Sequence, residues 1–158
     1  MIEVNRELIP HAVFGHPQVA SVGMTERQAA EAGISFKAHV QQYGSAAYGW
    51  AMEDTTSIVK LVMDSRTRTL LGAHICGPQA STLIQQLIQG MVFGRTVDEM
   101  SRGQYYIHPA LPEVIDCNVV GVPDPQWGAA VTAVVKHSMN VGRIKFLEGA
   151  TTFDVDIC

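Results

Sequence analysis

The sequence predicts an α+β fold in which helices flank an antiparallel β-sheet. Two runs rich in apolar and β-branched residues, 56–63 and 69–76, have the composition of strands. The Asp-Ser-Arg-Thr-Arg stretch near their junction is typical of a turn, so we expect an antiparallel hairpin. The longest helix is expected at 79–93, where apolar side chains recur at helical spacing. Strands and a helix that each carry an apolar face predict one layered core.

The remaining elements are short and follow from cap and turn residues. Thr25 with Gln28, and Thr96 with Glu99, fit capping boxes, which mark helix starts. Gly94 fits the end of the long helix. The expected elements are an extended segment within 11–23, a helix over 26–32 that ends at Gly33, a strand over 34–43, a helix over 97–101, and a last helix just after residue 109.

Composition excludes several classes of function. The 158 residues are 47% hydrophobic and only 16% charged, with a net charge of −4, so a nucleic-acid partner has no support. No apolar run approaches the length of a membrane span, and we expect no membrane partner. Three widely spaced cysteines favour a reducing, cytoplasmic location. A surface with so little charge fits a chain that buries part of its exterior against partners.

The most informative side chains are a histidine and a carboxylate, His108 and Glu113, separated by Pro109 and Pro112. A carboxylate that accepts from an imidazole fixes the tautomer of the ring and stabilises imidazolium, so the two form an acid–base pair. Pro109 disfavours helical geometry at His108, so a turn must fold the carboxylate back onto the ring. The alternative is a simple turn in which Glu113 favours the start of a helix.

A family resemblance favours the acid–base pair. Tyr-Ile-His-Pro-Ala-Leu-Pro-Glu at 106–113 resembles the H-P-x-x-x-E signature of the pyridine nucleotide–disulfide oxidoreductases. Residues 13–26 (Val-Phe-Gly-His-Pro-Gln-Val-Ala-Ser-Val-Gly-Met-Thr-Glu) resemble the start of the C-terminal interface domain of that family, and 71–80 (Leu-Gly-Ala-His-Ile-Cys-Gly-Pro-Gln-Ala) resemble a later motif of it. The motifs occur in the right order over roughly 8–116. Within the family, residues 48–56 are most similar to mycothione reductases.

The resemblance implies roles for the pair and its neighbours. In the intact enzymes the interface domain forms a homodimer, and the pair reaches the flavin and redox disulfide of the other subunit. His108 would protonate the leaving thiolate of a small-molecule disulfide substrate, and Glu113 would orient it. His108 and Pro109 would contact the flavin, and the peptide bond between them would be cis.

The resemblance also implies FAD and NADPH as cofactors of the intact enzyme. A dinucleotide site needs a strand, a G-x-G-x-x-G turn and a helix, and no such run occurs here. The family's pair of redox cysteines is missing as well. We therefore expect neither cofactor to bind this chain alone, and a partner would have to supply the flavin and NADPH domains.

The chain divides into two expected parts, a dimerisation domain at 1–117 and a divergent tail at 118–158. Residues 119–135 weakly resemble the C-terminal subdomain of acyl-CoA synthetases, so a gene fusion or a shifted reading frame would explain the tail. The alternative function is a non-enzymatic dimerisation module or an inert truncated gene product.

Other candidate side chains are expected to be structural. We expect no metal site, because His11 and His16 lack the spacing and the Cys or Glu partners that zinc sites use. The remaining expectations are core packing for His74, Cys76 and Cys117, and either a substrate cleft or core packing for Trp50, Tyr105 and Tyr106.

Overall fold

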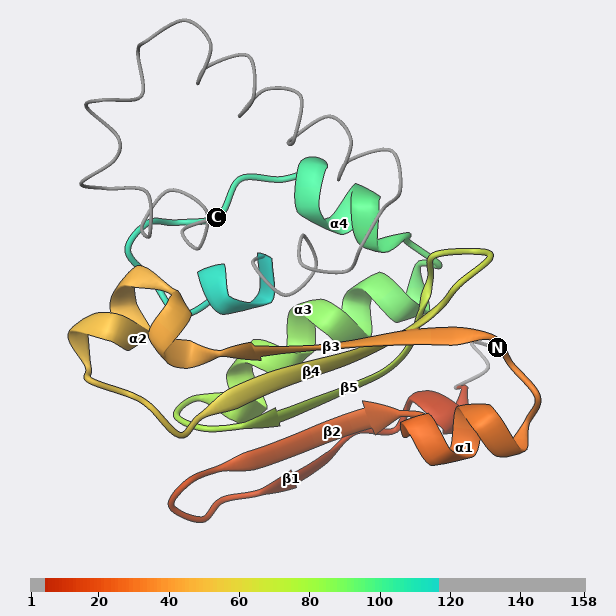
Figure 1. The fold of residues 1–158 in the computed structure, drawn as a ribbon, viewed down its shortest axis with the longest axis horizontal. Coiled ribbons are helices and arrows are strands. Elements are labelled where there is room, and N and C mark those ends of the chain that lie inside the picture. Colours follow the sequence, from red (N-terminus) through yellow and green to blue (C-terminus); the bar gives the residue numbers. More distant parts are fainter. Residues whose placement is uncertain (1–4, 117–158) are drawn as a thin grey trace, which may run out of the picture.

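A computed structural model describes residues 5–116 of the protein, and these contain a five-stranded antiparallel sheet in the order β1-β2-β5-β4-β3 (Figure 1). The α+β prediction is confirmed. The strands are β1 (His11–Val13), β2 (Val19–Gly23), β3 (Phe36–Gln42), β4 (Ile58–Asp64) and β5 (Leu70–Cys76).

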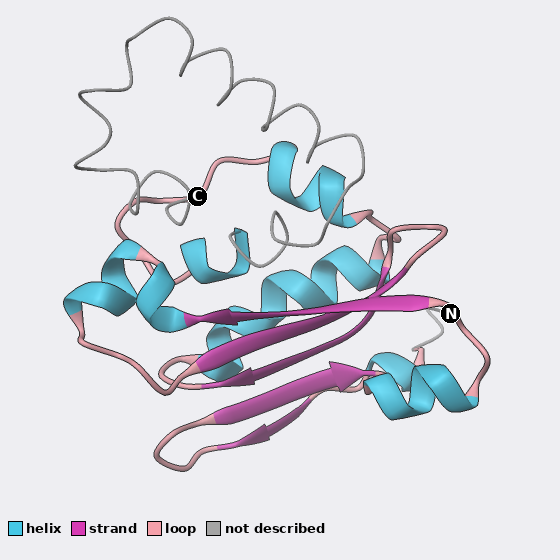
Figure 2. Ribbon diagram, viewed as in Figure 1, coloured by secondary structure: helices cyan, strands magenta, loops and turns pink. Residues whose placement is uncertain are grey.

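Short helices connect the strands, and one longer helix covers the sheet (Figure 2). The helices are α1 (Glu26–Glu31), α2 (Ala47–Ala51), α3 (Ala80–Val92) and α4 (Val97–Arg102), with single 3₁₀ turns at η1 (Arg6–Leu8) and η2 (Tyr43–Ser45). Residues 113–116 form a further helical turn. Among residues 5–116, no helix is both long and apolar enough to cross a bilayer.

The hairpin and both capping boxes are confirmed. β4 and β5 pair antiparallel, and the Thr25 and Thr96 boxes start α1 and α4. Gly33 and Gly94 follow α1 and α3 with φ of 69° and 61°, the left-handed conformation expected after a helix.

One expectation about short elements needs correction, and one short helix was not expected. The extended segment at 11–23 is two strands, β1 and β2, joined by a turn that contains a cis His16–Pro17 bond. The helix α2 was not predicted, because five residues carry no readable periodicity. It packs closely on η2: a Cβ on Gly49 would lie 1.9 Å from the Tyr43 carbonyl oxygen. That contact is visible only in three dimensions.

The core lies between α3 and one face of the sheet. Leu83, Ile84 and Leu87 of α3 are buried against this face. The same cluster includes Leu111, Val114 and Ile115. The turn that carries the predicted acid–base pair is therefore anchored in the core.

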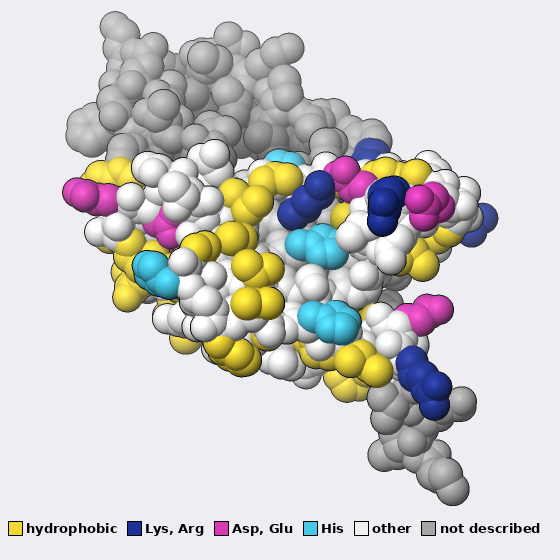
Figure 3. All heavy atoms as spheres, turned by 90° about the horizontal axis from the view of Figure 1, so that it is seen from below, with side chains coloured by type: hydrophobic (Ala, Val, Ile, Leu, Met, Phe, Trp, Pro, Cys, Tyr) yellow, Lys and Arg dark blue, Asp and Glu magenta, His cyan; other side chains and the backbone are white. Residues whose placement is uncertain are grey.

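The other face of the sheet is more exposed. Because directly paired residues share a face, the strand register places Val40, Lys60, His74, Ser21 and His11 in one row across it. Figure 3 looks at the molecule from below and shows histidine and hydrophobic side chains close together on the surface.

The expected core packing of His74 and Cys76 is wrong. Both side chains are only half-buried, because alternation along β5 turns them away from α3. The His74 Nε2 is instead 3.2 Å from the Met24 carbonyl oxygen, within hydrogen-bonding distance. Cys117 lies outside the described residues.

Candidate functional site

The structure brings the predicted histidine and carboxylate together. The Nδ1 of His108 lies 2.5 Å from Oε1 of Glu113, and the His108–Pro109 bond is cis, as predicted. The side chain of Glu113 is only 6% exposed, whereas that of His108 is 60% exposed. The pair therefore has a fixed, buried acceptor and a ring that reaches solvent.

The second carboxylate oxygen of Glu113 also has a donor. Oε2 accepts a hydrogen bond from the backbone N–H of Ala110 at 3.1 Å. An ionised carboxylate only accepts, so the ring nitrogen facing it carries the proton when Glu113 is charged. Buried Leu111 and Val114 flank the carboxylate in the chain and hold the turn in place. This arrangement leaves Nε2 of His108 to exchange protons with a bound molecule.

The loop between α4 and His108 is held by a tyrosine. The hydroxyl of Tyr106 accepts from Gln104 at 2.8 Å and donates to the Met100 carbonyl at 3.3 Å. Burial raises the pKa of Tyr106 to about 12, so it stays a neutral donor. Of the aromatic residues considered for a cleft, Tyr106 packs against the core, whereas Tyr105 is fully exposed.

A small hollow of about 350 Å³ lies beside the pair. The side chains that line it all carry polar atoms and include charges of both signs. The residues that line it are Ser101, Arg102, Gln104, Tyr105, Tyr106, His108, Glu113 and Asp116. Two of the three expected cleft aromatics are thus near the pair; Trp50 lies on α2, 65% exposed, and does not line this hollow.

Sequence reasoning missed four residues of this hollow, Ser101, Arg102, Gln104 and Asp116. The Ser101 hydroxyl donates to Asp116 Oδ1 at 3.1 Å. Burial, and then the nearby charge of Glu113, raise the pKa of Asp116. The spacing of Asp116 three positions after Glu113, one helical turn, was the available signal.

The described residues contain no group of three or more His, Cys, Asp or Glu side chains that could hold a metal ion. His11 lies on the short edge strand β1 and His16 in the turn that follows it.

Comparison with known proteins defines the class of protein to which this fold and this histidine–carboxylate turn belong. Residues 9–119 match the family of the pyridine nucleotide-disulphide oxidoreductase dimerisation domain, and the chain belongs to that family. Among curated proteins, it is 55% identical over 122 residues to mycothione reductase of Mycobacterium tuberculosis, which covers 77% of this chain and 27% of the relative.

More distant relatives belong to the same group of enzymes. Over 110 residues the chain is 33% identical to the mitochondrial dihydrolipoyl dehydrogenase of Schizosaccharomyces pombe, covering 70% of this chain and 21% of the relative. The chain thus spans between 21% and 27% of the length of these curated relatives.

Solved structures agree on the fold. The HOCl-induced flavoprotein disulfide reductase RclA of Escherichia coli superposes with a TM-score of 0.69 at 27% identity, over 75% of this chain and 27% of the other. LpdA of Mycobacterium tuberculosis superposes equally well, with a TM-score of 0.69 over 74% of this chain and 25% of its own, at 20% identity, which shows the shared fold alone.

Proposed function

We propose that this dimerisation domain supplies an acid–base pair to a flavoprotein disulfide reductase of the mycothione reductase type. The observation that carries the proposal is the 2.5 Å hydrogen bond between exposed His108 and buried Glu113. A histidine so oriented, with one nitrogen engaged and the ring open to solvent, is suited to general acid–base work.

The proposed role of His108 is to deliver a proton to a departing thiolate. When a disulfide is cleaved, one sulfur leaves with the electron pair of the S–S bond as a thiolate. Imidazolium at His108 would give its Nε2 proton to this sulfur, which yields a thiol and neutral imidazole. Glu113 would hold the ring by Nδ1 throughout and stabilise its charged form.

The described residues do not fit a dinucleotide. Their five-stranded sheet is entirely antiparallel and lacks the parallel strand–turn–helix unit that binds a pyrophosphate. We therefore propose that FAD and NADPH are held by other domains of the reductase, in a homodimer with a small-molecule disulfide as substrate. Contact of His108 and Pro109 with the flavin, and a cytoplasmic location, belong to the same proposal.

A chimera tests this function. Residues 9–119 would replace the matching segment of Mycobacterium tuberculosis mycothione reductase, with which the chain shares 55% identity. In this chimera, His108→Gln should leave flavin reduction by NADPH intact and slow disulfide turnover about 10²–10⁴-fold, the usual contribution of general acid–base catalysis. Stopped-flow absorbance separates the two half-reactions.

The matched control is His16→Gln. His16 also precedes a cis proline and is exposed, but it lies in the β1–β2 turn. The His16→Gln substitution should leave both half-reactions unchanged. Unchanged disulfide turnover in His108→Gln would contradict the proposal and would favour a dimerisation module without catalytic residues.

A further inference from the structure

We propose that Asp116 is a positioning residue for the His108–Glu113 pair and acts through its hydrogen bond to Ser101. The inference rests on the proposed function, because it assigns a support to the same site. It concerns the geometry of the pair, so it can be measured without flavin or substrate.

His108 needs such support because little packs around it. Its side chain is 60% exposed, and it follows Ile107, which is 76% exposed. The hydrogen bond to Glu113 therefore fixes the ring, and the placement of Glu113 becomes decisive. A catalytic group must be held within a fraction of an ångström by the residues behind it.

Glu113 begins the helical turn at 113–116, and Asp116 is the last described residue of that turn. The bond from Ser101 Oγ to Asp116 Oδ1 fastens the turn to α4. The pair is thereby connected to a second helix, in addition to the apolar contacts of its own turn.

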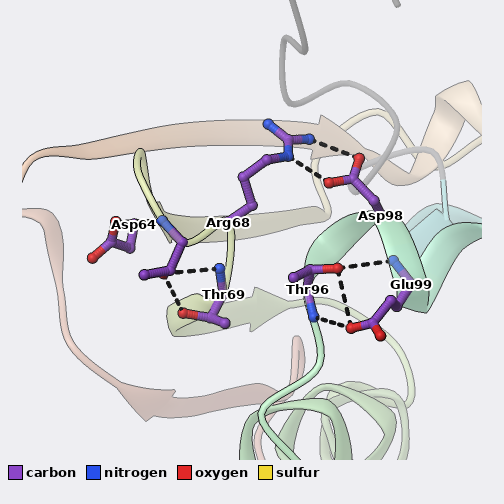
Figure 4. Close-up of polar contacts among 7 residues, drawn as sticks. Asp64, Arg68, Thr69, Thr96, Asp98 and Glu99 are labelled. Carbon is purple, nitrogen blue, oxygen red and sulfur yellow. Dashed lines mark hydrogen bonds and ion pairs between the residues drawn. The ribbon is translucent and has the colours of Figure 1, made fainter.

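The helix α4 is itself fixed at its first turn (Figure 4). The Arg68 side chain reaches from the β4–β5 turn and donates two hydrogen bonds to Asp98, at 2.5 and 2.9 Å. The Thr96–Glu99 capping box closes the same end of the helix. The first turn of α4 is thus tied to the β4–β5 turn, and Ser101 lies on the same short helix and donates to Asp116, so Ser101 is a stable anchor.

The placement of Asp116 is costly on its own. It is half-buried, shares the hollow with the carboxylate of Glu113, and has a raised pKa from burial and from that charge. Arg102, on the same hollow, supplies a positive charge. The Ser101 hydroxyl offsets part of this cost, because its hydrogen bond to Oδ1 stabilises the carboxylate and acts to lower the pKa of Asp116.

The experiment follows the Nδ1–H proton of His108 by NMR in the ¹⁵N-labelled 158-residue chain. Ser101→Ala and Asp116→Ala should each accelerate exchange of this proton with water about fivefold, because a typical hydrogen bond contributes about 1 kcal/mol. Asp116→Asn keeps an oxygen acceptor for Ser101 and should restore most of the protection. Glu113→Ala, which removes the acceptor itself, sets the upper limit.

Ser81→Ala is the matched control, since the Ser81 hydroxyl donates to Gln18 Oε1 at 3.2 Å, away from the hollow. It should leave exchange at His108 unchanged. The proposal is overturned if Ser101→Ala has no effect, or if Asp116→Asn matches Asp116→Ala, which would mean that charge alone acts. Loss of turnover in the chimera is a separate readout, so either proposal can fail without the other.

Discussion

Glu113 combines a charge with two engaged oxygens, and substitution can separate these properties. Glu113→Gln keeps an oxygen for the His108 ring but loses the charge. Hydrogen bonds to charged groups exceed neutral ones by about 1.4 kcal/mol, so disulfide turnover of the chimera should fall about tenfold, less than in His108→Gln. Steady-state kinetics with saturating NADPH measures this.

The control for the Glu113 variant is Glu31→Gln, which neutralises an exposed carboxylate at the end of α1. It should leave turnover unchanged. A loss as large as that of His108→Gln would show that Glu113 does more than orient the ring.

The lowered pKa of Asp98 predicts that the free energy of unfolding depends on pH. The hydrogen bond from Arg68 is the main cause that lowers the pKa of Asp98. A folded-state pKa below the unfolded value of about 3.9 adds stability above that value, and this stability is lost as the pH falls through the folded pKa. Asp98→Asn should therefore cost about 1–2 kcal/mol at pH 7, and the difference from wild type should shrink below about pH 4.

Urea unfolding at pH 7, 5, 3.5 and 2.5 measures this difference. Arg68→Gln removes the other partner and should cost most at neutral pH, like Asp98→Asn. A difference that stayed constant down to pH 2.5 would mean that the ion pair of Figure 4 contributes nothing to folding.

At the scale of elements, α2 depends on one close approach. A methyl group at Gly49 would lie 2.4 and 1.9 Å from the carbonyl carbon and oxygen of Tyr43. These are backbone atoms, which cannot move away as the end of a flexible side chain can. Gly49→Ala should destabilise the chain by about 1–3 kcal/mol, the usual cost of overpacking. Gly15→Ala is the control, since its added Cβ would lie 3.3 Å from the Pro17 carbonyl oxygen, a tight contact but a far milder one than at Gly49. Equal urea midpoints for the two variants would contradict the packing account.

The elements that the sequence predicted are those with a repeating signal. The β4–β5 hairpin and α3 are long enough to show periodicity and turn chemistry, and α1 and α4 have capping boxes. The division of the expected extended segment at 11–23 into β1 and β2 was not predicted, because the three residues of β1 are exposed and are defined by pairing with β2.

The site was predictable only where the signal was local. The His108–Glu113 contact was expected from the family signature, because no regular spacing brings positions five apart together through two prolines. The bond between Ser101 and Asp116 joins residues fifteen positions apart and depends on how α4 packs, which the sequence does not report.

At the scale of the molecule, the exposed surface predicts self-association. Several large hydrophobic side chains are well exposed, and only 16% of the residues carry charge. The largest exposed fractions among them belong to Phe14, Trp50, Phe93, Tyr105 and Ile107. Obligate interfaces commonly bury more than about 2,000 Å² of largely apolar surface. The exposed hydrophobic side chains of this chain can contribute to such an interface.

Light scattering on the purified 158-residue chain should give a mass above that of the monomer, rising with concentration. The association should persist at high salt, because apolar contacts are not screened. A monomer mass at every concentration would contradict this prediction.

The acid–base pair is compact along the chain as well as in space. His108, Glu113 and the Ala110 N–H that completes their hydrogen bonding lie within five positions of one another. Recombination between genes cuts at discrete points, so a crossover on either side of this stretch transmits the pair whole. Pairs assembled from distant segments are separated by most crossovers. A recombined gene can therefore inherit this pair as one unit, whereas the Ser101–Asp116 support is inherited only with the longer stretch at 101–116.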